Sequence, residues 1–413
     1  MKGAVPVKER RARIWDVLFF AVLFAGYVAL TGYLFYHQAI GNESWFHSDV
    51  KAYILEMQGL DSGYEFPYPV LFKLGAFFDL WLSPEAAITV ALVLLNSLSP
   101  IVLKYYLDRE LTKELTEDLS KEKKRLMVGL GATVLVFTLL VVSMLFPLDG
   151  SSFPGIQGRY KGVFSPNPHH NATYLAARPF AIACFFQFAE LLREYEVKFC
   201  WKKGICFGAT LLLATMTKPS FTLVLVATAG LIMLYRLFRS KFANFKNTVF
   251  LGICFIPTFV DLLYQFGGVF GPKEGAETGL GFGWLTAWSY HCDNIPVAIL
   301  AALAFPCVVC LIHFRELKED NKYRFSVQFV LMSLATALLL YEKGFRVGDM
   351  NFSWGYMYGM FFGFVGAGTV MVRSTLLKNK KWYLLTAEWG VYLLHLICGL
   401  LYFKNSLAGL MYY

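Results

Sequence analysis

One carboxylate and three cations are the side chains best suited to act together in a reaction. A carboxylate can remove a proton from an attacking hydroxyl group. Arginine and lysine can stabilise the negative charge that develops on a departing phosphate. Ionisable groups beside apolar segments are costly, and they tend to be functional when they face a cavity. The candidates are the general base Asp49 and the phosphate-binding residues Arg178, Lys218 and Arg346.

The elements that must position these residues are apolar helices. Of 413 residues, 57% are hydrophobic and only 16% are charged, whereas soluble domains carry about 25% charged residues. The apolar residues form unbroken runs, and about 20 helical residues suffice to cross a hydrocarbon core. The sequence therefore predicts an all-α integral membrane protein. Long runs include residues 14–37, 85–102, 127–146 and 249–266.

The basic residues and the cysteines exclude other classes of protein. Despite a net charge of +9, most Lys and Arg residues cluster in short loops between apolar runs, which indicates membrane orientation and not nucleic-acid binding. The eight cysteines show no disulfide framework, and most lie in apolar runs or in loops expected to be cytoplasmic, which favours a packing role. The first apolar run is about twice as long as a signal-peptide core and is interpreted as a retained helix.

The basic residues also predict the topology. A basic N-terminal segment puts that end in the cytoplasm, and the basic loop 104–125 is expected there too. Only one of the two apolar stretches that follow the first helix can therefore cross. The stretch 67–82 is short and contains Lys73 and Asp79, so we expect juxtamembrane helices on the outer surface. The remaining runs bring the total to about 11 transmembrane helices, with the C-terminus outside.

With this topology, the polar residues of the first loop, the loop 147–173 and the later outer loops lie on the extracytoplasmic side. The longest such stretch, the first loop at 38–84, falls short of about 50 residues, the lower limit for a domain. We therefore expect no separate soluble domain and a site built from loops and helix ends. The substrate-binding candidates on this side are His47, Tyr68, His169, His170, Asn171 and Asp349.

Three segments resemble the GT-C glycosyltransferases. "WFHSDVKAYIL" (45–55) lies where that family has an acidic residue in its first extracytoplasmic loop, and Asp49 takes the acidic position. "FPYPVLFKLGAFF" (66–78) is similar to a juxtamembrane Pro-rich segment of enzymes related to protein O-mannosyltransferases and lipid A aminoarabinose transferase, although it lacks the Pro-Pro dipeptide. "LLLATMTKPSFTLVL" (211–225) resembles a helix–turn–helix whose Thr-Lys pair meets the lipid phosphate, and Lys218 matches that lysine.

The resemblance covers residues 1–240 and leaves residues 241–413 as variable C-terminal transmembrane helices. It implies a GT-C type bundle in the plasma (inner) membrane and a polyprenyl-phosphate-linked sugar donor. Asp49 would deprotonate an unknown glycan, lipid or protein acceptor for inverting transfer on the extracytoplasmic face. "HSD" has no adjacent acid, which favours a reaction without a metal or cofactor over one that uses a divalent cation. The adjacent His169 and His170 point to different sides of a helix, and no third metal ligand is near in sequence.

The sequence leaves other interpretations of these residues open. Asp49 and Asn171 could each cap the helix that follows. Lys218 could extend to anionic headgroups, and Arg346 could lie in an ordinary solvated loop. The alternative function is a multi-pass transporter or lipid flippase with Asp261 in its pathway, because an ionisable residue inside a span is itself a candidate ion or proton site.

Overall fold

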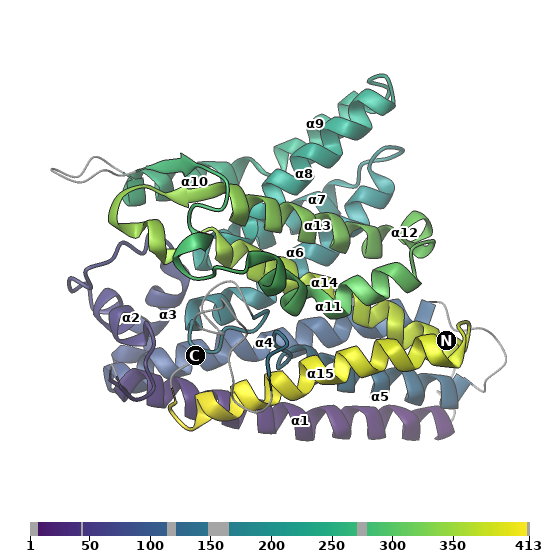
Figure 1. The fold of residues 1–413 in the computed structure, drawn as a ribbon, viewed down its shortest axis with the longest axis horizontal. Helices are drawn as coiled ribbons and strands as arrows, with labels where there is room; N and C mark the ends of the chain where they lie inside the picture. Colours follow the sequence, from purple (N-terminus) through teal and green to yellow (C-terminus); the bar gives the residue numbers. More distant parts are fainter. Residues whose placement is uncertain (1–6, 43, 114–120, 148–164, 271–278, 411–413) are drawn as a thin grey trace.

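The computed structural model of this chain is a bundle of long helices that run along one common direction (Figure 1). It describes residues 7–42, 44–113, 121–147, 165–270 and 279–410. The short helices α2 (Val50–Met57) and α3 (Pro69–Asp79) lie at one end of the bundle, and α12 (Glu316–Glu319) lies at the other. The bundle thus has two distinct ends, each built from loops and short helices.

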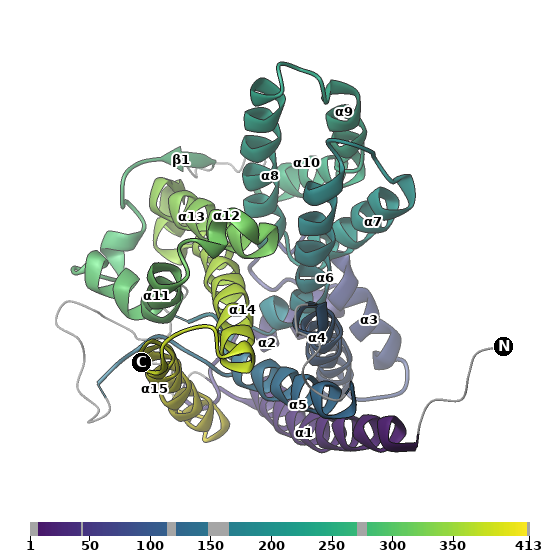
Figure 2. The same ribbon diagram turned by 90° about the vertical axis from the view of Figure 1, so that its right-hand side faces the viewer.

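Residues 7–270 form one side of the bundle. The first helix packs against the next two long helices, and the fourth long helix packs on the second (Figure 2). Two further long helices and a bent pair extend from there to the opposite edge. These elements are α1 (Val7–Ile40), α4 (Pro84–Lys113), α5 (Lys121–Leu139), α6 (Ala172–Glu194), α7 (Trp201–Thr217), α8 (Ser220–Arg239), α9 (Phe245–Ile253) and α10 (Ile256–Phe270).

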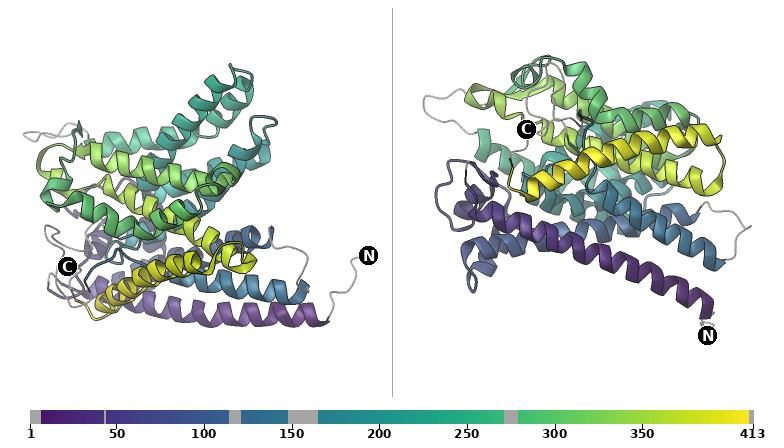
Figure 3. Two further views of the ribbon diagram at one scale, coloured as in Figure 1. Left: turned by 45° about the vertical axis from the view of Figure 1, so that its right-hand side comes forward. Right: turned by 60° about the horizontal axis from the view of Figure 1, so that its bottom comes forward.

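The remaining described residues, 279–410, close the bundle. Its central helix, α14, packs against α13, α11 and α8, and the last helix, α15, returns beside α1 (Figures 2 and 3). A two-stranded antiparallel sheet pairs Leu280 with Glu342 and Phe282 with Leu340. The elements are β1 (Leu280–Phe282), η1 (Trp288–Tyr290), α11 (Ile295–Ile312), α13 (Asn321–Leu339), β2 (Leu340–Glu342), η2 (Gly344–Asp349), α14 (Ser353–Leu377) and α15 (Trp382–Leu407).

Within the described residues, seven helices are long and apolar enough to cross a membrane: α1, α4, α6, α8, α11, α14 and α15. The bent pair α9–α10 makes an eighth if it is one span. In α1 only 17% of the most apolar window is buried inside the protein, so most of its apolar surface is left for lipid. The chain is therefore a multi-pass helical membrane protein, as the sequence predicts. The helices α5, α7 and α13 do not meet the same criteria of length and hydropathy.

One apolar run expected to be a single straight span is broken. Residues 249–266 fall on α9 and α10, which are bent by 48° relative to each other. Pro257 lies in the first turn of α10, where the missing N–H is harmless, whereas inside a continuous helix it would remove a backbone hydrogen bond. The bend also brings the carbonyl of Cys254 so close to Gly208 of α7 that a Cβ there would be 2.7 Å from the oxygen.

The contact between α13 and α14 depends on a row of glycines. A Cβ on Gly359 would collide with the Ser333 side chain, and a Cβ on Gly363 would be 2.8 Å from Val330 Cγ2. Lipid gives no hydrophobic drive between helices, so membrane helices associate through the close backbone contact that small residues permit. Glycine at these positions therefore sets the distance between the two helices.

Gly359→Ala tests this contact. Alanine is intrinsically better than glycine in a helix by about 1 kcal/mol, but overpacking at this interface costs about 1–3 kcal/mol. We expect Gly359→Ala to lower the melting temperature of the purified protein, and Ser333→Gly in the same chain to restore part of it. Gly390→Ala is the matched control, because its Cβ meets no atom within 4 Å. Equal melting temperatures for the two alanine variants would contradict the account.

Candidate active site

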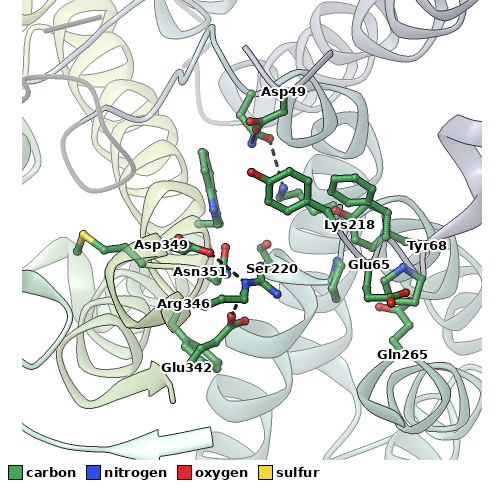
Figure 4. Close-up of a pocket in the computed structure, with 18 of the residues that line it drawn as sticks. Asp49, Glu65, Tyr68, Lys218, Ser220, Gln265, Glu342, Arg346, Asp349 and Asn351 are labelled. Carbon is green, nitrogen blue, oxygen red and sulfur yellow. Dashed lines mark hydrogen bonds and ion pairs between the residues drawn. The ribbon is translucent and has the colours of Figure 1, made fainter. Parts of the chain in front are cut away.

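A cavity of about 550 Å³ opens at the end of the bundle that carries α2 and α3 (Figure 4). Its walls come from the first loop, the start of α6, the α7–α8 turn, α10, β1, η2 and the start of α14. Segments far apart in the sequence thus contribute to one space. Its charged lining residues are Asp49, Glu65, Lys218, Glu342, Arg346 and Asp349.

Asp49 lies at the position that precedes α2, but its side chain makes no capping bond to that helix. Two donors reach its Oδ2 atom instead: Asn171 Nδ2 at 3.1 Å and the Tyr53 hydroxyl at 3.3 Å. Burial raises the pKa of the Asp49 carboxyl, and the nearby charge of Lys218 partly opposes that rise. Asp49 is therefore a carboxylate with a raised proton affinity at the wall of a cavity.

Asn171 caps α6, since its Oδ1 accepts a hydrogen bond from Tyr174 N at 3.0 Å. The same oxygen accepts from Lys218 Nζ at 3.3 Å and from the Thr173 hydroxyl at 2.9 Å. Its amide nitrogen donates to Asp49. The capping role that the sequence left open is confirmed, and the side chain also bridges the acid and the lysine.

Lys218 ends α7 and lies in the short turn before α8. Its ammonium group donates to Thr173 Oγ1 at 2.9 Å and to Asn171, and it lies 4.9 Å from the centre of the Trp354 ring. Burial lowers the pKa of Lys218 to about 8, although the charge of Asp49 acts to raise it. An ammonium has three donors, so one N–H remains for a ligand after these two bonds.

Arg346 lies across the cavity from Asp49 in the close-up (Figure 4). Its Nε atom is 3.2 Å from Glu342 Oε2 and 3.0 Å from Asp349 Oδ2. Burial raises the pKa of Glu342, and the charge of Arg346 opposes that rise. The arginine belongs to an ion-pair network and not to a freely solvated loop.

The small sheet fixes this second charged group. The pairing of β1 with β2 ends at Glu342, directly before η2, which carries Arg346 and Asp349. His291 Nε2 is 2.6 Å from the carbonyl oxygen of Gly348 and ties η2 to the preceding loop. Nothing in the local hydrophobic pattern distinguishes three-residue strands from loop, so the sequence did not predict this support.

The other predicted substrate-binding residues divide between the cavity and its surroundings. Tyr68, His170, Asn171 and Asp349 line the cavity. His170 Nδ1 lies 3.3 Å from the Tyr402 hydroxyl of α15. His47 and His169 are not among the lining residues. His169 is buried, its ring packs on Tyr402 and Phe403, and burial lowers its pKa to about 3.

The structure does not bring Arg178 to the cavity, in contrast to the expected phosphate contact. Its side chain is 1% exposed and lies within the bundle. The guanidinium donates to Asn167 Oδ1 at 2.7 Å, to the Tyr27 hydroxyl at 2.8 Å, to Asn96 Oδ1 at 3.0 Å and to Ser99 Oγ at 3.4 Å. With four of its five N–H donors bonded to α1, α4 and the loop before α6, Arg178 is a structural residue of the bundle.

Several residues of the site were not identified from the sequence. Tyr53 follows Asp49 by four residues, the spacing at which helical side chains meet, and this signal was available. Thr173 and Trp354 approach Lys218 from segments distant in sequence, and no local pattern reports such contacts. Among the described residues, no three His, Cys, Asp or Glu side chains gather closely enough to hold a metal ion.

No protein-family model matches the chain, and no curated protein matches it either. The functional argument therefore rests on the cavity and its residues.

Arg178→Met tests the structural role of the arginine. The change leaves Asn167 Oδ1 without its donor and removes one of the two donors to Asn96 Oδ1, which keeps the Tyr27 hydroxyl. A buried unsatisfied group costs about 1–3 kcal/mol. We expect a markedly lower melting temperature for purified Arg178→Met. Arg239→Met is the control because Arg239 is exposed. A melting temperature unchanged in both variants would show that the buried bonds do not stabilise the bundle.

Proposed function

We propose that this chain is a GT-C type glycosyltransferase that moves a sugar from a polyprenyl-phosphate donor to an acceptor on the extracytoplasmic face of the plasma membrane. The observation that supports this most strongly is that Asp49, Lys218 and Arg346 line one cavity. They come from the first loop, the α7–α8 turn and η2. A base and two cations around one space are the groups that transfer with loss of a phosphate needs.

Asp49 is the general base in this proposal. Among the described residues, both hydrogen bonds to its carboxylate end at Oδ2, so Oδ1 keeps its lone pairs for the acceptor hydroxyl. The acceptor oxygen forms a bond to the anomeric carbon as its proton passes to Asp49. The bond between that carbon and the phosphate oxygen breaks, and its electron pair leaves with the polyprenyl phosphate. Attack from the opposite face inverts the anomeric configuration.

Lys218 and Arg346 hold the departing phosphate. Lys218 has one N–H beyond its two bonds to Asn171 and Thr173. The two ion pairs of Arg346 involve only Nε, so they do not use the two terminal nitrogens, which can bind phosphate oxygens in a bidentate manner. Arg178 has no part in this step, because its donors are bonded inside the bundle.

An apolar part of the lining fits the prenyl chain of the donor. Leu223 comes from α8, and Leu262 and Phe266 come from α10. These two helices expose large apolar residues, including Leu231 on α8 and Leu263 on α10. Such surfaces are stable only in contact with lipid or a partner, which favours donor entry from the bilayer along α8 and α10.

The proposal includes an orientation with about 11 crossings. Seven are the helices with the clearest span character, the bent pair is the eighth, and α5, α7 and α13 supply the rest. The cytoplasmic N-terminus then puts α2, α3 and the cavity outside, with α2 and α3 as juxtamembrane helices. The acceptor is a glycan, lipid or protein, and the proposed reaction needs no cofactor.

The alternative function is a transporter or lipid flippase, and two charged residues within the helices are its candidate ion or proton sites. Asp261 of α10 pairs with Gln265, whose Nε2 is 2.8 Å from Asp261 Oδ2. Glu388 is fully buried and lies 2.7 Å from His313 Nε2. Asp261 has a hydrogen-bond partner on its own helix, so it requires no ion or proton pathway to account for its position.

Asp49→Asn tests the base. Asparagine keeps the shape of the side chain but cannot accept the proton, so we expect sugar transfer to fall by about 10²-fold or more. Reconstituted protein would be assayed with a panel of labelled polyprenyl-phosphate sugars and membrane extract as acceptor. Asp61→Asn, an exposed residue of the same loop, should retain activity. Full transfer by Asp49→Asn would contradict the assignment of Asp49 as the general base.

The pH dependence tests Lys218. The ammonium must be protonated to bind the phosphate, and its pKa is lowered to about 8, so transfer should decline as pH rises past this value. Lys218→Arg carries a cation that stays protonated, and its remaining activity should persist to higher pH. The measurement is kcat/KM against pH, and an identical alkaline decline in both proteins would count against Lys218.

Asp261→Asn separates the two functions. The enzyme proposal expects near wild-type sugar transfer, since Asp261 is absent from the cavity lining. The transporter interpretation would gain if Asp261→Asn, and not Asp49→Asn, abolished activity in cells that carry the variants at equal abundance.

A further inference from the structure

Asn171 occupies the centre of the cavity's polar network. Its Oδ1 accepts three hydrogen bonds, from Lys218 Nζ, Thr173 Oγ1 and Tyr174 N. A carbonyl oxygen has two lone pairs, so this atom has no capacity left for a substrate. Its Nδ2 donates to Asp49 Oδ2 at 3.1 Å.

The neighbours of the amide fix its orientation. With the nitrogen and oxygen exchanged, two amide hydrogens would face the Lys218 ammonium and the Tyr174 N–H, and the amide oxygen would face the Asp49 carboxylate. All of these contacts would be repulsive. The hydrogen-bond network therefore admits one orientation, with the donor toward the acid and the acceptor toward the lysine.

We propose that Asn171 is a positioning residue that bridges the general base Asp49 and the phosphate-binding Lys218 and thereby couples the protonation of one to that of the other. The proposal rests on the proposed function for its meaning in catalysis. It gives Asn171 a role in addition to the substrate contact expected from the sequence. The physical bridge itself can be tested without any donor or acceptor.

The bridge favours the charged form of both partners. A hydrogen bond donated to a carboxylate stabilises its anion, and an oxygen that accepts from an ammonium stabilises its cation. The other titratable groups that act on Asp49 are His47, Tyr53 and Tyr68. Tyr53 donates to the carboxylate, and its hydroxyl also lies 3.2 Å from Thr173 Oγ1, which accepts from Lys218. This second route to Lys218 runs through two side chains, whereas Asn171 alone contacts both Asp49 and Lys218.

Asn171→Ser separates the bridge from the helix cap. Serine caps helices about as well as asparagine, so α6 keeps its first turn. Its hydroxyl is too short to reach both Asp49 and Lys218. Asn294→Ser is the matched control, because Asn294 caps α11 through its contact with Val297 N and is absent from the cavity lining.

The experiment measures the pKa of Lys218 by competitive acetylation with acetic anhydride across a pH series, read by mass spectrometry of the Lys218 peptide. The proteins are the wild type, Asp49→Asn, Asn171→Ser, the double variant and Asn294→Ser, each as the full chain in lipid nanodiscs. We expect Asp49→Asn to lower the pKa of Lys218 by roughly one unit. In the Asn171→Ser background the same change should shift it by less than half as much.

An equal effect of Asp49→Asn in both backgrounds would overturn the bridge, as would a shift of the same size in Asn294→Ser. The proposed function can fail independently, because the labelling needs no sugar donor. If transfer is found, kcat/KM for Asn171→Ser should show both pH limbs moved inward, whereas a merely structural role would lower the rate without moving them.

Discussion

The buried guanidinium of Arg178 is the interaction on which the rest of the arrangement depends. It bonds to Tyr27 of α1, to Asn96 and Ser99 of α4 and to Asn167 of the loop before α6. Burying a cation without a carboxylate partner is costly unless its donors are satisfied, so the three segments must keep this geometry. Asn171 lies on the same helical segment, two turns earlier, and its position relative to the first loop follows from it.

The charged groups of the cavity are also held by hydrogen bonds and ion pairs, but these bonds do not use all of their donors and acceptors. In the interior, Arg178 is surrounded by neutral oxygens that use its donors. In the cavity, Asp49, Lys218 and Arg346 each keep capacity beyond their bonds within the protein, and Asp49 and Lys218 have pKa values displaced by burial. Groups that are held in place but not saturated are suited to exchange a proton or bind an anion.

The sequence predicts the elements better than it predicts the contacts. Apolar run length identifies the long helices. The order of motifs selects Asp49 and Lys218, a charged outer loop adds Arg346, and the structure brings the three to one cavity. The sequence could not show that Lys218 lines the cavity and Arg178 does not, since both are basic residues at the ends of apolar runs. Their difference lies in partners such as Asn96 and Thr173, which are distant in sequence. Pro257 was a local signal for the bend between α9 and α10 that the run length concealed.

The central claim is that the cavity takes a polyprenyl phosphate from the bilayer. The most direct measurement is a cryo-electron microscopy structure of the full chain in nanodiscs that contain polyprenyl phosphate. The account predicts density for the phosphate in contact with Lys218 and Arg346, with the prenyl chain leaving past Leu262 and Phe266 of α10. A cavity empty of lipid, with the phosphate bound at the opposite end of the bundle, would contradict it.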